Sequence, residues 1–306
     1  MDGVTQLRFR FMPPLPSVLG MTYELAIGDR AYSSWSLRGW LLCDAFGLDT
    51  RVRRAQMRTP EFAALLEGFA PARQVPAARL DGTVVWDSLA IAEELASRHP
   101  HAGHWPDDPA LRGLARSISA EMHAGFGALR SACPMNLRTA WGYAPTPEVR
   151  ADLERLEDLW DRAWDASGGP WLCGAYSAAD AFYAPVAMRI AGYGLPVSDR
   201  AGAYVERHLA HPSLRRWRAM SACDGPDQEV YEMGLPRRPF PGAPERRGAV
   251  VDGPSVNGAC PYSGEPVTHF MAFEGRTWGF CNAFCCDKTM ADPLAWPQFV
   301  EMMERG

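Results

Sequence analysis

Residues 77–98 read AARLDGTVVWDSLAIAEELASR, and they carry the strongest local structural signal in the chain. Two short apolar runs flank Asp81-Gly82, a dipeptide typical of tight β-hairpins. Asp87-Ser88 then precedes apolar residues at helical spacing, as expected for the capped start of a helix. The stretch therefore predicts two antiparallel strands followed by a helix.

Upstream of this unit, strand patterns and helix patterns alternate. We expect a strand at 22–28, a helix at 35–46 and a second strand at 51–55. Thr59 and Pro60 fit the N-cap and first position of another helix. The order β-α-β-α-β-β-α, with parallel strands joined by helices and closed by a hairpin, predicts a thioredoxin-like α/β domain.

The next part of the chain has a different pattern. Residues 111–131, 147–166 and 178–191 show helical periodicity, and there is almost no strand signal between them. The sequence therefore predicts an α/β thioredoxin-like domain at 21–103, followed by an all-α domain at 108–222.

Three further segments flank these domains. Residues 223–257 contain six prolines and little apolar periodicity, which is typical of a linker. Residues 258–306 hold four of the eight cysteines, which indicates a small Cys-rich α+β module stabilised by a metal. We expect residues 1–20 to be a disordered extension or the product of a misassigned start codon, with Met21 as the alternative start.

Composition and charge exclude several classes of protein. The 306 residues include 31 Lys+Arg and 36 Asp+Glu, a net charge of −5 without a basic block, which argues against nucleic-acid binding. No apolar run approaches the ~18 residues of a membrane span. The chain begins without the apolar segment of a secretory signal, so we expect a cytoplasmic protein. In that compartment, clustered cysteines indicate metal or redox chemistry more often than disulfides.

The domain layout and five segments resemble the glutathione S-transferases, in particular a bacterial, zeta-like type with a serine motif. The resemblance covers about residues 23–220. The five segments, in family order, are YSSWSLR at 32–38, QVP at 74–76, WDSLAI at 86–91, SISAEMH at 117–123 and PMN at 134–136.

This resemblance implies a transferase that activates the glutathione thiolate against an electrophilic small molecule, by conjugation, reduction or isomerisation. Ser33 or Ser34 would donate a hydrogen bond to the sulfur. Lowering a thiol pKa from about 8.5 by about two units requires roughly 2.7 kcal/mol of preferential stabilisation of the anion. A hydroxyl and a helix N-terminus together can supply this. The same serines also suit a purely structural helix cap.

The resemblance also implies a set of glutathione-binding residues: Gln74, Val75, Pro76, Asp87 and Ser88. Val75 would offer its backbone to the cysteinyl part of the tripeptide, with Pro76 in the cis form setting that backbone. Asp87 would pair with the γ-glutamyl ammonium, and Ser88 would receive the γ-glutamyl carboxylate at the helix N-terminus. An ordinary Asp-Ser helix cap is compatible with this assignment.

Other positions refine the expected role. Ser177 and Asp180 resemble the folding motif of the family, a capping box that we assign to stability. Zeta enzymes have Cys where this chain has Trp35, and their isomerases have a substrate-binding Arg where it has Gly192, with Arg189 nearest. These differences favour conjugation or reduction over maleylacetoacetate isomerisation.

Two further expectations follow from the family. Its members usually dimerise, so we expect a homodimer. Five side chains suit either the second-substrate pocket or the core: Trp35, Met122, His123, Phe126 and Met135.

The C-terminal cysteines have the spacing of a metal site. Cys260, Cys281 and Cys285 follow the pattern C-x20-C-x3-C, and two short strands followed by a helix would bring three thiolates together. The pattern, with GRTWGFC and ADPLAW around it, resembles TRASH/YHS-type metal-binding modules. Thiolates favour Zn²⁺ or Cu⁺, although the site could also have lost its metal. The fourth ligand is left open between Cys286, Asp287, His269 and water.

This module suggests an alternative function for the whole chain. The transferase part would then be a non-catalytic scaffold, and the cysteine cluster would act in metal binding, trafficking or sensing.

Overall fold

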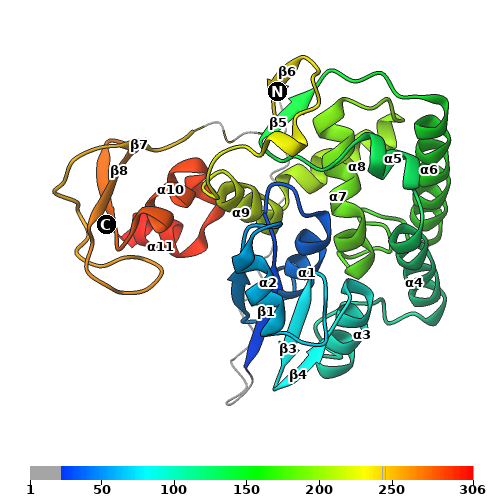
Figure 1. Ribbon diagram of the computed structural model, residues 1–306, viewed down its shortest axis with the longest axis horizontal. Helices are drawn as coiled ribbons and strands as arrows, with labels where there is room; N and C mark the ends of the chain where they lie inside the picture. Colours follow the sequence, from blue (N-terminus) through cyan, green and yellow to red (C-terminus); the bar gives the residue numbers. More distant parts are fainter. Residues whose placement is uncertain (1–21, 243, 245, 306) are drawn as a thin grey trace, which may run out of the picture.

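The computed structural model describes residues 22–242, 244 and 246–305 (Figure 1). The expected N-terminal extension at 1–20 and the alternative start at Met21 lie outside the described residues. None of the helices in the described ranges is both long enough and apolar enough to cross a membrane.

The first domain is built on a four-stranded sheet with the strand order β2-β1-β3-β4. Strand β1 is parallel to β2 and antiparallel to β3, which is antiparallel to β4. The elements are β1 (Tyr23–Ile27), α1 (Ser34–Asp44), β2 (Arg51–Arg54), α2 (Pro60–Glu67), β3 (Ala77–Leu80), β4 (Thr83–Val85) and α3 (Ser88–Arg98). This order confirms the predicted thioredoxin-like α/β fold.

Short-range signals explain why these elements form where they do. Asp81 and Gly82 both have positive φ angles, 48° and 88°, as a tight hairpin between β3 and β4 requires. The Thr59 hydroxyl accepts a hydrogen bond from the backbone N–H of Phe62 at the start of α2. Asp87 caps α3 in the same way. Each cap satisfies a backbone donor that the helix itself leaves without a partner.

The second domain is helical, as predicted. Its helices are α4 (Pro109–Ala124), α5 (Gly127–Ala132), α6 (Pro147–Ser167), α7 (Ala178–Tyr193), α8 (Asp199–Ala210) and α9 (Pro212–Ser221). Helix α7 is buried almost all round and contacts α4, α8 and, in the first domain, α1 (Figure 1). It therefore joins the two domains.

Asp180, near the start of α7, is fully buried. Its carboxylate accepts hydrogen bonds from the N–H of Leu172, the N–H and hydroxyl of Ser177, and the hydroxyl of Tyr204. Burial raises its pKa to about 6, although these four donors oppose the shift. The contacts tie the start of α7 to the preceding loop and to α8, which agrees with a structural role.

The proline-rich segment after α9 is more ordered than its composition indicates. A 3-10 turn, η1 (Glu229–Tyr231), stacks Tyr231 on Tyr32 with ring centroids 4.2 Å apart. Strand β6 (Arg237–Pro239) pairs antiparallel with β5 (Thr139–Trp141), a strand that the helical pattern did not predict.

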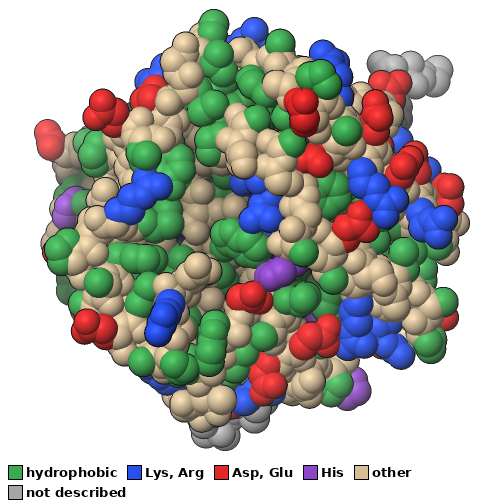
Figure 2. All heavy atoms as spheres, turned by 45° about the vertical axis from the view of Figure 1, so that its right-hand side comes forward, with side chains coloured by type: hydrophobic (Ala, Val, Ile, Leu, Met, Phe, Trp, Pro, Cys, Tyr) green, Lys and Arg blue, Asp and Glu red, His purple; other side chains and the backbone are tan. Residues whose placement is uncertain are grey.

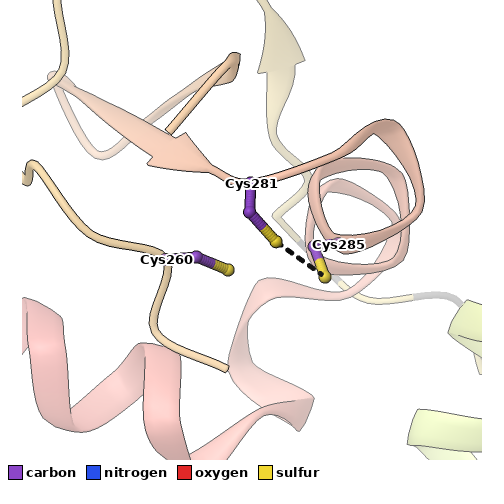
Figure 3. Close-up of side chains that lie close together, drawn as sticks. All are labelled: Cys260, Cys281 and Cys285. Atoms are coloured by element: carbon purple, nitrogen blue, oxygen red, sulfur yellow. Dashed lines mark hydrogen bonds between the residues drawn. The ribbon is translucent and has the colours of Figure 1, made fainter. Parts of the chain in front are cut away.

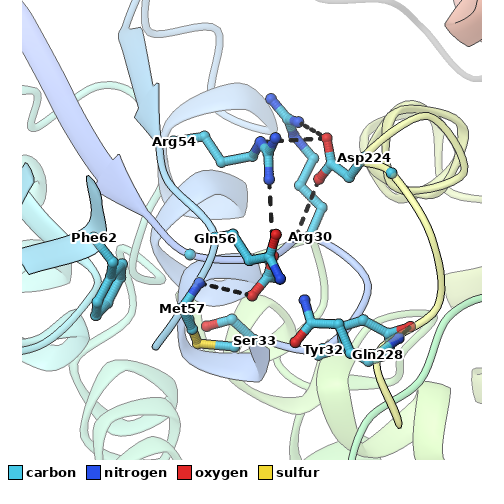
Figure 4. A network of polar contacts seen from close by, with 12 residues as sticks. Arg30, Tyr32, Ser33, Arg54, Gln56, Met57, Phe62, Asp224 and Gln228 are labelled. Atoms are coloured by element: carbon cyan, nitrogen blue, oxygen red, sulfur yellow. Dashed lines mark hydrogen bonds and ion pairs between the residues drawn. The ribbon is translucent and has the colours of Figure 1, made fainter. Parts of the chain in front are cut away.

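The start of this segment is also tied to the first domain by charge. Asp224 forms ion pairs with Arg30, at 2.6 Å, and with Arg54, at 3.4 Å (Figure 4). The N–H of Gln228 donates to the Tyr32 hydroxyl. Part of the expected linker is therefore packed across the α/β domain.

The tail is a small three-stranded sheet with helices against it. It comprises β7 (Ala249–Val250), β8 (His269–Phe273), β9 (Arg276–Phe280), α10 (Ala283–Ala291), η2 (Pro293–Ala295) and α11 (Pro297–Arg305). Its core is aromatic, with Trp278, Phe280 and Phe299 packed together. Helix α10 packs on α9, and Figure 1 shows the tail projecting from that side of the molecule.

Candidate active site and metal centre

A cavity of about 470 Å³ lies where the two domains meet. Figure 2 shows a hollow on one face of the molecule, with basic side chains at its floor and a histidine beside an acidic side chain. The cavity is lined from the first domain by Trp35, the loop 71–76, Trp86 and Asp87, and from the second by His123. Four of the five expected glutathione-binding residues therefore line one space: Gln74, Val75, Pro76 and Asp87.

The fifth residue, Ser88, does not line the cavity but directly follows Asp87, which does. It is the first residue of α3, and its buried hydroxyl has no hydrogen-bond partner. The peptide bond between Val75 and Pro76 is cis, as expected. Val75 lies just before β3 and the N-terminus of α3 just after β4, so both lie at the same end of two paired strands.

The two candidate serines differ in their surroundings. Ser33 is buried and is the N-cap of α1: its oxygen accepts from the N–H of Ser36, and its hydroxyl donates to the Ser36 oxygen at 2.8 Å. Ser34 is half-buried, and its oxygen accepts from Nη2 of Arg189 at 3.5 Å. The Ser33 hydroxyl therefore already donates its proton within the helix cap. The Ser34 oxygen only accepts in its contact with Arg189, so the Ser34 hydroxyl can still donate to another acceptor.

His123 lines the cavity, although the sequence left it open between the second-substrate pocket and the core. Its Nε2 lies 3.1 Å from the Asp87 carboxylate, and its ring meets that of Trp35 edge-on. Of the five side chains that suited either pocket or core, His123 and Trp35 line the cavity. Met122, Phe126 and Met135 are buried in the core. The only sequence signal for His123 was its position in the 117–123 segment.

The tail brings three cysteines together, as the spacing predicted. One ligand atom from each of Cys260, Cys281 and Cys285 lies within 4.8 Å of the others (Figure 3). Among the described residues, Cys286, Asp287 and His269 do not join this group. The three thiols form one face of a ligand set for a soft metal ion.

The surroundings of the cluster act differently on two of its thiols: they favour ionisation of Cys260, whereas burial raises the pKa of Cys285 to about 12. Burial opposes ionisation of Cys260, but backbone hydrogen bonds from Cys281, Tyr262 and Ser263 outweigh it and lower the pKa to about 7. The Ser263 hydroxyl and the Asn282 amide donate to the Cys281 sulfur, at 3.3 and 3.2 Å. These donors suit a thiolate ligand because it carries negative charge.

Comparison with known proteins assigns the fold of the first two domains. Residues 32–98 match the family described as glutathione S-transferase, N-terminal domain. A glutathione transferase homologue from Burkholderia GL BGR1, solved with bound glutathione, has a TM-score of 0.51 and 24% identity; the match covers 67% of this chain and all of that one. The omega 3C transferase of Trametes versicolor has a TM-score of 0.50 and 17% identity, with 68% and 90% of the two chains covered.

Curated relatives carry the name maleylacetoacetate isomerase. A probable isomerase of Caenorhabditis elegans is 34% identical over 104 residues, 33% of this chain and 49% of that protein. The Pseudomonas aeruginosa isomerase is 28% identical over 172 residues, 51% of this chain and 77% of that protein. The chain spans about half the length of the first of these relatives.

The first two domains have the glutathione transferase fold. Within them, residues 32–98 match the N-terminal domain family of the glutathione S-transferases.

Proposed function

We propose that this protein is a glutathione-dependent transferase. The observation that carries the proposal is the convergence on one cavity of Gln74, Val75, Asp87 and Trp35, the residue that follows Ser34 at the start of α1. These groups suit the separate parts of glutathione: Asp87 the ammonium, the α3 N-terminus with Ser88 the γ-glutamyl carboxylate, and Val75 the cysteinyl backbone. The glutathione bound in the Burkholderia homologue supports this ligand.

Ser34 supports the chemistry better than Ser33. A thiol near the start of α1 would lose its proton to solvent and be held as an anion by the Ser34 hydroxyl and the helix N-terminus. The thiolate would attack an electrophilic carbon and form a C–S bond. Protonation of the neighbouring carbon then yields a conjugate, whereas re-expulsion of the sulfur after bond rotation yields an isomer.

The names of the curated relatives favour the isomerising version of this reaction. Arg189, the arginine nearest to position 192 in the sequence, contacts the Ser34 oxygen at 3.5 Å. A basic residue is therefore close to the reacting position, although it is not at the position that the family pattern indicated. We propose an electrophilic, unsaturated small molecule as the second substrate.

The test combines glutathione binding with kinetics. Wild type should bind glutathione by calorimetry and conjugate a model electrophile, and Ser34→Ala should lose about tenfold to hundredfold in kcat/KM, the effect of about 1.5–3 kcal/mol for a hydrogen bond to a charged group. Ser117→Ala, on the exposed face of α4, is the matched control. A wild-type protein that does not bind glutathione would refute the proposal.

The cysteine cluster supports a second function, metal binding by the tail. We propose that Cys260, Cys281 and Cys285 hold one Zn²⁺ or Cu⁺, which would stabilise the small tail domain. Elemental analysis of the purified protein should find about one such ion per chain, and Cys281→Ser should lose it. Loss of the metal with unchanged glutathione turnover would separate this role from the transferase reaction. Purified wild type without metal, even after metal-supplemented expression, would contradict this role.

Two further proposals complete this function. We propose a homodimer, as is usual for this fold, with size-exclusion chromatography and light scattering as the test. We also propose a cytoplasmic location, because reduced thiols suit both the cysteine cluster and glutathione chemistry. Fractionation of cells that produce the full chain would test the location.

A further inference from the structure

Three arginines converge beside Ser34, where α1, α5 and α7 meet. The guanidinium carbons of Arg38, on α1, and Arg130, on α5, lie 4.4 and 4.9 Å from the centroid of the Trp35 ring. Arg189, on α7, contacts the Ser34 oxygen. Trp35 lines the cavity, so the positive charges lie at and behind its wall.

In the described part of the chain, the charges of these three arginines are not balanced by ion pairs. Among the residues that the structure describes, no ion pair within 4.0 Å joins any of the three arginines to a carboxylate. The hydrogen-bond partners of Arg189, apart from Ser34, are the carbonyls of Cys133 and Pro185. Arg38 is only 1% exposed, and its Nε and Nη1 have no hydrogen-bond partner.

Such an arrangement is costly unless an anion balances it. A buried charge without a counter-charge loses several kcal/mol of hydration. Burial, and after it the neighbouring arginines, lowers the pKa of Arg38 to about 9 and that of Arg189 to about 10. The protein therefore maintains a region of positive potential next to Ser34.

The other ionisable groups around the cluster do not neutralise it. Asp87 acts electrostatically on Arg38, but it is paired with His123. Burial raises the pKa of the Cys133 thiol to about 12 and raises the pKa values of the Tyr183 and Tyr193 hydroxyls, so these groups are neutral near pH 7.

We propose that this arginine cluster stabilises the anionic sulfur of glutathione at Ser34, with Arg189 as a positioning residue that acts through the Ser34 hydroxyl. The inference rests on the proposed function and adds residues to it. Arg38 and Arg189 are 1% and 5% exposed, so they act through their field rather than by docking a substrate carboxylate. In a poorly solvated site such a field is only weakly screened. The thiol proton goes to solvent, and no other bond changes.

The experiment measures the pKa of the thiol in the glutathione complex, from the ultraviolet absorbance of the thiolate against pH. In Arg189→Met and Arg130→Met this pKa should rise by about one pH unit, the lower end of the effect of a nearby opposite charge. Arg189→Lys should keep most of the wild-type value because it retains the charge. Arg130 is half-buried, so its variant stays informative if Arg189→Met does not fold.

Arg207→Met is the matched control. Arg207, on α8, also lies over a tryptophan, Trp171 at 5.8 Å, and also donates to a backbone carbonyl, but it is far from Ser34 in the fold. The thiol pKa of this variant should equal that of wild type.

Each outcome bears on the proposal. An unchanged thiol pKa in folded, glutathione-binding Arg130→Met and Arg189→Met would overturn it. If the thiol pKa is unchanged in these variants and their KM rises only for an electrophile that carries a carboxylate, the proposal is also overturned. The arginines would then bind the second substrate. If wild type does not bind glutathione, the proposed function itself fails, and this failure is visible before any variant is compared.

Discussion

The Asp87 carboxylate joins the two domains through His123. One oxygen, Oδ1, accepts from the N–H of Leu89 and caps α3, while Oδ2 lies 3.1 Å from Nε2 of His123 on α4. Each oxygen thus has its own partner. The side chain that we assign to the glutathione ammonium is therefore oriented from both domains.

Replacing His123 should weaken glutathione binding modestly. The Asp87 side chain is about half exposed, and exposed ion pairs contribute at most about 1 kcal/mol, so His123→Ala should raise the Kd about two- to fivefold. His123→Gln, which keeps a hydrogen-bond donor, should lie closer to wild type. Isothermal titration calorimetry measures the effect, and equal Kd values in all three proteins would contradict an orienting role.

Ser33→Ala should act mainly on stability. The variant removes the side-chain acceptor for the Ser36 N–H at the start of α1, which costs about 1 kcal/mol. Urea denaturation gives the free energy of unfolding, and the loss of kcat/KM should be smaller than in Ser34→Ala. A stable Ser33→Ala protein without activity would reverse our assignment of the two serines.

Buried histidines should make the protein sensitive to mild acid. His104 donates to the Leu42 carbonyl and stacks on Phe46, and burial lowers its pKa to about 4. In the unfolded chain His104 takes up a proton near pH 6.5, whereas in the folded protein it does so only near pH 4. The contribution of His104 to the free energy of unfolding is therefore complete above pH 6.5 and decreases as the pH falls towards 4. The slope is about 1.4 kcal/mol per pH unit for this one proton.

The variant His104→Gln isolates this contribution. The free energy of unfolding of this variant, measured by urea denaturation between pH 7 and pH 4, should fall less steeply with decreasing pH than that of wild type. The difference between the two slopes should correspond to the uptake of about one proton on unfolding. His211, whose pKa burial and then Arg216 also lower to about 4, remains in both proteins. Parallel pH curves for the two proteins would show that His104 is not responsible.

An ion pair should hold the tail against the helical domain. Arg215 on α9 donates two hydrogen bonds to the buried Asp292 carboxylate, at 2.9 and 2.7 Å. Arg215→Met leaves that carboxylate buried without its partner, which we expect to cost about 3 kcal/mol. Hydrogen exchange in residues 258–305 should become faster, while the exchange of β1 and α1 should not change.

The control for this prediction is Arg305→Met, on the same tail. Arg305 pairs with Glu301 within α11, and both side chains are mostly exposed. Its loss should change exchange in the tail little, because exposed pairs of this kind contribute only about 0.3–0.5 kcal/mol. If both variants loosen the tail equally, the Arg215–Asp292 pair has no special role.

The parts of the fold that the sequence predicted depend on neighbours in the chain. The Asp81-Gly82 hairpin, the Thr59 cap and the Asp87 cap each involve residues two to four positions apart, so their signals are complete in short segments. The cysteine cluster was also predictable, because the spacing C-x20-C-x3-C over two strands and a helix start is typical of a thiolate metal site.

The pairing of β5 with β6 was not predictable in the same way. These strands lie about a hundred residues apart, and each is only three residues long. Their formation depends on a partner that no local pattern reveals. For the same reason, the proline-rich segment resembled a linker until its contacts with Tyr32 and Arg30 were known.

By itself, the sequence determined the α/β domain with its helix caps, the helical domain, and the segments from which the cavity and the cysteine cluster are built. Only the tertiary structure decided which of the two serines has a proton to donate, that His123 faces Asp87, and that three arginines from α1, α5 and α7 meet at Trp35. The physical reason is that caps and turns arise from forces within a few residues, whereas charge and burial depend on every element that packs around a group.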